Sequence, residues 1–343
     1  MYDPGLVSAA LLVCPACRSR DDHGLHVQTL EPSPASDELR CACGRRYPIV
    51  DGVAVILADP TAVVRDQLAA LLETAPTAAL AALLADVGPD DAPYARLLEQ
   101  VSIYVDAHWG DRAEPPPDGP AADLGPPCAL ASLVARVSAR AAHRVEHAVE
   151  LGCSAGRILA ELAAGAERTV GLDLDLATLR RGRRILAGER VSYLRRVIGR
   201  HYAAAHVPPG PLPPGAAQAV MICGDALDPP LIHGWFDRVV ALNVIDAVAS
   251  PRQLLTVMDG LCAPGGELLL ASPYRWQSAH LEDAERLGGA DPARDLVALL
   301  EAGIGLSARY RIEDEAELPW VLRRDSRTAI AYRTHYVRAR KGT

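Results

Sequence analysis

The alternation of strand-like and helix-like segments from residue 128 onward constrains the fold of this chain more than any other feature. The apolar runs HAVELG and RTVGLDLD are each followed by a helical pattern, and FDRVVALNVIDAV precedes the helical segment PRQLLTVMDGLC. Strands that alternate with helices form a parallel sheet with helices on both faces. We therefore predict an α/β fold with a mostly parallel sheet over residues 128–343.

The rest of the chain divides by composition into two further segments. Residues 1–58 hold four of the eight cysteines and end in YPIVDGVAVIL, which reads as a strand, so we expect a small β-rich module. Residues 59–127 show two or three helical patterns and then six prolines between 115 and 127, which exclude a helix or a strand ladder there. We interpret this part as a helical lid and linker.

Net charge and hydropathy limit the classes of partner that the chain can bind. The formal net charge is −8, which argues against a dedicated nucleic-acid binder, and no apolar run reaches the roughly 18 residues that cross a bilayer. No secretion signal is evident, so we expect a cytoplasmic protein with a small-molecule substrate and no membrane partner. Eight arginines lie between positions 180 and 200. They indicate either a solvated helical face, which we favour, or a track for RNA.

A glycine-rich turn begins the predicted sheet. The first strand ends at Leu151, Gly152 and Gly156 follow, and a helix starts at once. Such a turn lets a ligand approach the backbone, and the helix N-terminus offers free amide donors. The next strand ends in Asp173, where an acid can bond both hydroxyls of a ribose. The pair predicts an adenosine-containing cofactor.

Later strand ends point to one cofactor. The third strand ends in CGDAL, the fourth in ALNVIDAV, and LCAPGGELLL precedes the fifth. Together these motifs resemble those of class I S-adenosylmethionine-dependent methyltransferases, which implies a Rossmann-like, mostly parallel seven-stranded sheet and S-adenosylmethionine as cofactor. The resemblance implies that the methionine part, the ribose and the adenine are bound by Glu150, Gly152, Cys153, Gly156, Asp173, Leu174, Asp225, Ala226 and Asn243.

Four further stretches suggest the substrate. HWG at 108–110, NVIDAVASPRQLL at 243–255, ASPYRWQSAH at 271–280 and LPWVLRRDSR at 318–327 resemble the mercaptohistidine N-methyltransferase domain of ovothiol-producing enzymes. This resemblance implies methyl transfer to a nitrogen of a small imidazole-like or amino-acid-like heterocycle. The sequence departs from that family in RLGG at 286–289, where W-L-G-G is expected.

Methyl transfer needs an oriented nucleophile and, for a protonated acceptor, a base. Asp246 and His108 are the candidates for the base, and Tyr274 is a third catalytic candidate. The alternatives are that Asp246 caps the following helix and that His108 is an ordinary surface histidine. The residues expected to bind substrate are Tyr104, Trp276, Arg323 and Arg327, of which the two arginines, four apart, would grip a carboxylate.

The N-terminal cysteines form two pairs, Cys14 with Cys17 and Cys41 with Cys43, in the usual arrangement of a zinc ribbon. CPAC and CGRRYPIVDG resemble the small zinc-ribbon activators that pair with methyltransferases acting on RNA and protein. The resemblance implies structural zinc held by four thiolates, although the second pair is C-x-C where C-x-x-C is usual.

Two alternatives follow from that kinship. The chain would then be an RNA or protein methyltransferase, or a non-catalytic S-adenosylmethionine-binding activator of a partner. A homodimer is a further arrangement that the sequence leaves open.

Overall fold

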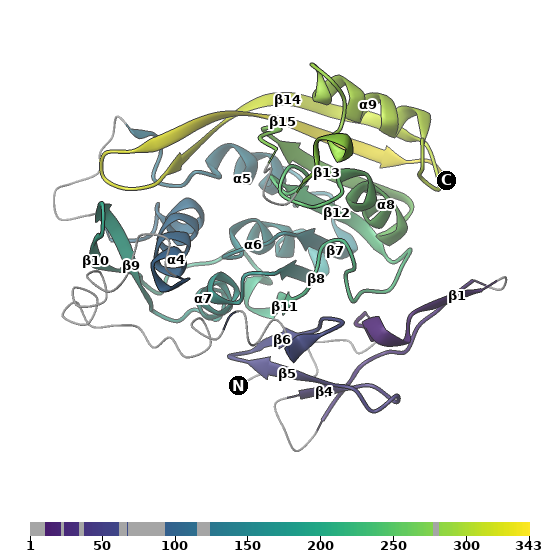
Figure 1. Cartoon of the computed structure of the whole chain (residues 1–343), viewed down its shortest axis with the longest axis horizontal. Coiled ribbons are helices and arrows are strands. Elements are labelled where there is room, and N and C mark those ends of the chain that lie inside the picture. Colours follow the sequence, from purple (N-terminus) through teal and green to yellow (C-terminus); the bar gives the residue numbers. More distant parts are fainter. Residues whose placement is uncertain are drawn as a thin grey trace.

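The computed structural model describes residues 11–21, 24–33, 38–61, 67, 93–114, 124–276 and 281–343. Its centre is a single mixed sheet of eleven strands in the order β14-β15-β13-β12-β7-β8-β11-β6-β5-β4-β3 (Figure 1). Helices cover it on both faces. The helices expected between residues 68 and 92 and most of the proline-rich linker, 115–123, lie outside the described residues.

Five parallel strands form the middle of the sheet. They are β7 (Val145–Leu151), β8 (Ala166–Asp173), β11 (Val220–Cys223), β12 (Phe236–Leu242) and β13 (Cys262–Ser272). The crossovers contain α6 (Arg157–Ala163), α7 (Leu176–Leu186) and α8 (Pro251–Leu261). From β7 the strand order runs one way to β8 and β11 and the other way to β12 and β13. The carboxyl ends of β7 and β12 therefore flank the crevice where such sheets bind ligands.

A long antiparallel hairpin forms the far edge of the sheet. β14 (Tyr310–Arg323) pairs with β15 (Ala329–Lys341), and β15 lies beside β13. The segments SARYRIEDE and TAIAYRTHYVRAR read as two strands of such a hairpin, with ELPWVLRRDSR between them. In the structure β14 continues through this intervening segment as far as Arg323. Two further helices, α5 (Ala131–Ser138) and α9 (Pro292–Ala302), pack near this hairpin.

The N-terminal module adds four strands to the sheet. They are β3 (Glu31–Pro32), β4 (Glu38–Arg40), β5 (Arg46–Val50) and β6 (Val53–Val55), while β1 (Ser19–Asp21) and β2 (Gly24–His26) form a separate pair. YPIVDGVAV is therefore a hairpin and not one strand. Its turn residues Asp51 and Gly52 have φ of 50° and 78°, as a two-residue turn of type I′ requires.

Among the described residues, 128–343 contribute seven strands to this sheet, as predicted. The N-terminal module enlarges it to eleven, because β6 pairs in parallel with β11 and continues the sheet. The Ile56 amide donates to the Cys223 carbonyl at 2.9 Å. Near the first cysteine pair, the Val13 amide donates to the Pro230 carbonyl at 3.0 Å, and Arg18 donates to Pro229 at 2.6 Å. The module is thus bonded to the segment that follows β11.

The arginine-rich segment is not one helical face. α7 ends at Leu186, and the remaining residues form the hairpin β9 (Val191–Ile198) and β10 (His201–Val207). Most of its arginines pair with acids of this chain, in the pairs Arg180–Asp51, Arg184–Glu189, Arg190–Glu114, Arg195–Asp106 and Arg196–Glu99. This internal pairing leaves little unbalanced charge for an RNA backbone.

Helix α4 (Pro93–Trp109) lies between the β9–β10 hairpin and the sheet (Figure 1). Glu99 on this helix pairs with Arg196 of β9 at 2.6 Å and also with Arg324 at the end of the terminal hairpin. These ion pairs tie three separate segments together over one end of the sheet. In the part of the chain that the structure describes, we find no helix with the length and apolar character needed to span a membrane.

Candidate functional site

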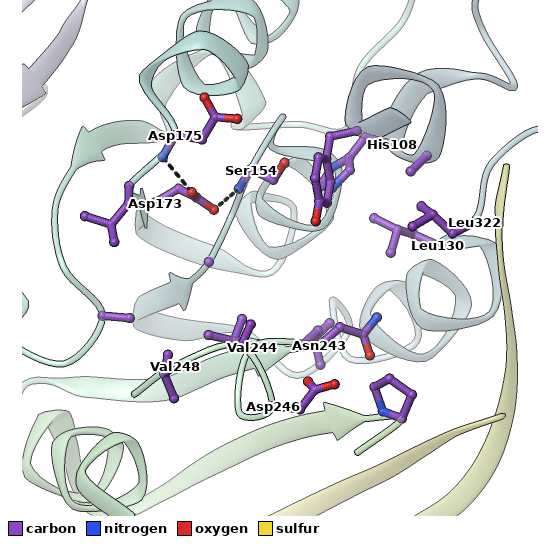
Figure 2. Close-up of a pocket in the computed structure, with 18 of the residues that line it drawn as sticks. His108, Leu130, Ser154, Asp173, Asp175, Asn243, Val244, Asp246, Val248 and Leu322 are labelled. Carbon is purple, nitrogen blue, oxygen red and sulfur yellow. Dashed lines mark hydrogen bonds between the residues drawn. The ribbon is translucent and has the colours of Figure 1, made fainter. Parts of the chain in front are cut away.

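A cavity of about 340 Å³ lies at the carboxyl ends of the parallel strands (Figure 2). Helix α4 and the terminal hairpin contribute to its walls through Tyr104, Trp320 and Tyr332. The predicted site residues that line it are Tyr104, His108, Gly152, Asp173, Leu174, Asp225, Ala226, Asn243 and Asp246.

The glycine-rich turn has the conformation its sequence requires. Gly152 has φ of 78°, and a Cβ on it would lie 2.4 Å from the Val244 side chain. Gly156, also with φ of 78°, immediately precedes α6. Cys153 is buried behind the turn and packs against Gly171: if Gly171 had a Cβ, that atom would lie 2.8 Å from Cys153 Sγ. Its role is therefore packing, and it does not line the cavity.

Asp173 ties the glycine-rich turn to the start of the next helix (Figure 2). Its Oδ2 accepts the Ser154 amide at 3.0 Å and its Oδ1 accepts the Asp175 amide at 2.9 Å. Burial nevertheless raises the pKa of this carboxyl to about 6. A carboxylate fixed by two amides at a strand end still has lone pairs directed at the cavity, which suits hydroxyl donors of a ribose.

The third strand end completes this side of the cavity. The Gly224 amide donates to the Asp173 carbonyl at 3.0 Å, and Asp225 Oδ1 accepts the Leu227 amide at 2.8 Å. Glu150 lies deeper: it is buried, it does not line the cavity, and its Oε2 has no hydrogen-bond partner among the described residues. Burial raises its pKa well above the ordinary value.

The other side of the cavity is formed by the loop after β12. Asn243 adopts φ of 59°, and its Oδ1 is a buried acceptor without a partner in the described part of the chain. Asp246 is buried, accepts the Arg275 amide at 3.0 Å, and has a pKa raised by burial. The next helix is capped by Ser250, whose Oγ accepts the Gln253 amide, so Asp246 is not its cap.

His108 is buried and faces the cavity, so it is not a surface histidine. Its Nδ1 accepts the Arg157 amide at 3.2 Å, and burial, with the nearby Arg157 cation, lowers its pKa to about 3. The neutral ring then carries its proton on Nε2. This arrangement favours a hydrogen-bond donor over the base suggested by the sequence.

Among the residues predicted for catalysis and substrate binding, four lie away from the cavity lining. The Tyr274 hydroxyl is 2.8 Å from His335 Nδ1, and Trp276 packs on the Tyr274 ring at 5.9 Å between centroids. Arg323 donates to the Gly125 carbonyl at 3.0 Å. Arg327 lies in the turn of the terminal hairpin, and its amide donates to Asp325 at 2.8 Å. The two arginines are on a strand and a turn, so helical spacing does not bring them together.

The lining residues that sequence reasoning missed include Arg275, Trp320 and Tyr332. Trp320 and Tyr332 are cross-strand partners whose rings stack at 4.5 Å and 23°. Arg275 Nη1 donates to the Tyr332 hydroxyl at 2.6 Å. The segment LPWVLRR does not alternate polar and apolar residues, so no local signal in the sequence indicated this pair.

The four N-terminal cysteines converge. Their Sγ atoms all lie within 4.8 Å of one another, with Cys14 and Cys43 at 4.0 Å and Cys17 and Cys41 at 3.6 Å. Tetrahedral zinc with Zn–S bonds of about 2.3 Å needs sulfurs about 3.8 Å apart. Gly44, at φ of 90°, closes the second turn, and its amide donates to the Cys41 carbonyl at 2.9 Å. The C-x-C pair is thus compatible with a structural four-thiolate zinc site.

Comparisons with known families match the two parts of the chain separately. Residues 149–270 match the model of a methyltransferase domain, and residues 9–52 match that of Trm112p-like proteins. No curated protein matches the chain.

Solved structures with a related fold include several methyltransferases. The N-methyltransferase NodS from Bradyrhizobium japonicum, bound to S-adenosyl-L-homocysteine, is 16% identical over 62% of this chain and 85% of its own, with a TM-score of 0.39. The magnesium protoporphyrin IX methyltransferase ChlM from Synechocystis is 14% identical over 62% and 78%, with a TM-score of 0.38. These low scores carry no argument about the substrate.

Proposed function

We propose a function for a chain that joins a class I methyltransferase fold to a Trm112-like N-terminal module: it transfers a methyl group from S-adenosylmethionine to a nitrogen of a small metabolite. The acceptor class that we propose is an imidazole-like or amino-acid-like heterocycle. We assign residues 1–58 to the zinc-ribbon module, 59–127 to a lid and linker, and 128–343 to the methyltransferase domain.

The cofactor would be held on the β7, β8 and β11 side of the cavity. S-adenosylmethionine, when bound, supplies a methyl group activated by a sulfonium. Gly152 leaves room for its methionine part, Asp173 accepts from ribose hydroxyls, and Asp225 with Ala226 contacts adenine. Two of these residues, Asp173 and Asp225, are acidic, which suits a cofactor that carries a positively charged sulfonium and an amino group.

The observation that carries the nitrogen assignment is Asp246. It is the buried carboxylate on the β12 side of the cavity, and burial raises its pKa toward the range of a useful base. A nitrogen that enters protonated needs such a group to remove its proton. The Asn243 Oδ1 acceptor lies in the same loop and would orient an N–H of the acceptor.

Two features support a small acceptor. The cavity has about 340 Å³ and is bordered by α4 and the terminal hairpin, which Glu99 ties together through Arg324. Because the same cavity has to take the cofactor as well, the remaining room suits only a small acceptor. Five of the eight arginines between positions 180 and 200 form ion pairs within the chain, which weakens the sequence argument for RNA.

A second candidate is methylation of RNA or protein. It is favoured by the match of residues 9–52 to Trm112p-like proteins. The same module would also suit a non-catalytic activator that binds S-adenosylmethionine and docks on a partner enzyme.

Label transfer separates these functions. The purified chain is incubated with S-adenosylmethionine labelled in its methyl group and with small-molecule, RNA and protein fractions of the host. We expect label in the small-molecule fraction, on nitrogen by mass spectrometry. Label in RNA or protein alone contradicts the proposal, and tight cofactor binding without any transfer favours the activator. Asp246→Asn serves as the inactive control.

A further inference from the structure

The turn after β13 directs two neighbouring side chains to opposite sides. Tyr274 adopts φ of 52°, which is unusual for a bulky residue, and its amide donates to Ser272 Oγ at 2.9 Å. Its hydroxyl bonds to His335, whose Nε2 is 2.9 Å from Glu315. These contacts hold Tyr274 away from the cavity. Arg275 lines the cavity while it stays exposed to solvent.

Arg275 is fixed at its backbone and at its tip. Its amide donates to Asp246, its Nη1 donates to the Tyr332 hydroxyl at 2.6 Å, and its Cζ lies 5.8 Å from the centre of the Tyr332 ring. Tyr332 in turn stacks on Trp320. The contact with Tyr332, whose ring is itself held by Trp320, orders the guanidinium group before any ligand arrives.

Arg275 is also the one arginine or lysine that lines the cavity among the residues the structure describes. None of the ion pairs found there involves it. The other charged groups of the lining are carboxylates, namely those of Asp173, Asp175, Asp225 and Asp246. An ordered cation in an acidic cavity attracts an anionic group of the ligand, and its planar fork fits a carboxylate with two parallel bonds.

We propose that Arg275 binds a carboxylate of the methyl acceptor, so that this site selects small nitrogen nucleophiles that carry an acid group. The inference rests on the proposed function and narrows its substrate class. A carboxylate fits better than a phosphate, because a dianion would face the nearby Asp246 with only one cation to balance it.

The position of Arg275 indicates that the acid group it would bind belongs to the acceptor and not to the cofactor. It follows β13, next to β12, whereas the residues proposed for the cofactor follow β7, β8 and β11. The unpaired, buried Nε1 of Trp320 lies on the same side and offers a second donor to the acid. Tyr332 acts as a positioning residue through its bond to the guanidinium.

Label transfer into fractionated metabolites tests the substrate class. The small-molecule fraction is divided on an anion exchanger at high pH, where amino acids and other carboxylates are retained. We expect methyl label in the retained part. Label confined to the unretained part overturns the inference and leaves the proposed function intact, whereas label in neither part removes the proposed function itself.

Binding of two probes tests the residue. L-histidine and histamine share a ring and an amine and differ in the carboxylate, and their affinities are measured on the full chain saturated with S-adenosylhomocysteine. We expect histidine to bind about 10- to 100-fold more tightly than histamine, and Arg275→Gln to abolish the difference. Equal binding to the wild type, or no binding of histidine, overturns the inference.

A matched variant separates recognition from general damage. Arg333→Gln changes an exposed arginine of β15 next to Tyr332, outside the cavity lining, and should keep the preference for histidine. The affinity for S-adenosylhomocysteine should be the same in wild type, Arg275→Gln and Arg333→Gln. A loss of cofactor affinity in Arg275→Gln alone would show that the guanidinium holds the cofactor and would overturn the assignment.

Discussion

The two sides of the cavity differ in how their polar groups are held. On the side of β7, β8 and β11, both oxygens of Asp173 accept backbone amides, and Asp225 accepts another. Among the lining residues on the side of β12 and the hairpin, Asp246 accepts the Arg275 amide, but Asn243 Oδ1 and Trp320 Nε1 have no partner in the described ranges. A buried polar atom without a partner costs about 1–3 kcal/mol. The first side is therefore organised by the chain itself, and the second is completed by the molecule that binds there.

Removal of zinc should have the largest effect. It should lower the folding stability of the chain and the cofactor affinity of the β7, β8 and β11 side of the cavity. We expect Cys41→Ser to lose the metal and several kcal/mol of stability, because structural zinc contributes most of the folding energy of such modules. Cofactor affinity should fall too, since Arg18, next to the first cysteine pair, donates to Pro229 in the segment after β11. Metal analysis, thermal unfolding and calorimetric titration measure these effects.

The control for this variant is Cys128→Ser, which changes a buried thiol outside the module that donates to the Ala107 carbonyl. It should keep one zinc per chain. A wild type that is fully folded without metal would overturn the structural role of the cluster.

Asp246→Asn should come next and should affect only the second side. General bases contribute typically 10²- to 10⁴-fold to a rate, so we expect a loss of kcat in that range with unchanged affinity for S-adenosylhomocysteine. The ionised carboxylate is the active form. Wild-type kcat should therefore fall as the pH drops through a pKa above the ordinary value for aspartate, since burial raises it. A variant with full kcat, or one that binds the cofactor poorly, would contradict this division of the cavity.

Asp173→Asn should weaken cofactor binding with little effect on selectivity among acceptors. The variant removes the carboxylate charge and one of the oxygens proposed to accept ribose hydroxyls, which we expect to cost about 2–3 kcal/mol of cofactor binding, or roughly 30- to 150-fold in affinity. Asp237→Asn is a matched control, because Asp237 Oδ2 also accepts two amides, those of Glu146 and His147, at the start of β7. Equal cofactor affinity in wild type and Asp173→Asn would show that the strand assignment is wrong.

The last expected effect is on the pH dependence of stability, not on binding or catalysis. The folded pKa of Asp173 is about 6 against an ordinary 3.8, so the folded state binds this proton more tightly than the unfolded state. The contribution of this group to the free energy of unfolding is therefore fully present below pH 3.8 and declines as the pH rises to about 6. Unfolding of wild type and Asp173→Asn in urea between these limits should give a difference that changes with pH. A constant difference would contradict the raised pKa.

The difference between the two sides of the cavity also explains which site residues the sequence could predict. Gly152, Gly156, Asp173 and Asp225 each follow a recognisable strand, and the carboxyl ends of parallel strands meet at one edge of a sheet. The order of the strands along the chain was therefore enough to predict that these residues lie close together. The zinc ligands followed in the same way from two local cysteine pairs.

The acceptor side depends on features without a local signal. Arg275 reaches the cavity because Tyr274 adopts a positive φ, and Trp320 meets Tyr332 through the register of a hairpin whose strands are longer than predicted. Arg323 and Arg327 were chosen by helical spacing in a segment that is a strand and a turn. The pairing of β6 with β11 joins segments more than 160 residues apart. β6 has three residues and β11 has four, and strands this short carry too little pattern to predict which strand they pair with.

That pairing also determines how the sheet ends. Without β6, the apolar strand β11 would present a row of open amides and carbonyls, which is the usual template for aggregation. With the module in place, the last strand on this side is β3, which has two residues and contains Pro32. The opposite edge, β14, carries the charged run Arg311 to Glu317. Proline and charge both discourage further strand addition, so the module should act as a cap that keeps the catalytic sheet from joining its own copies.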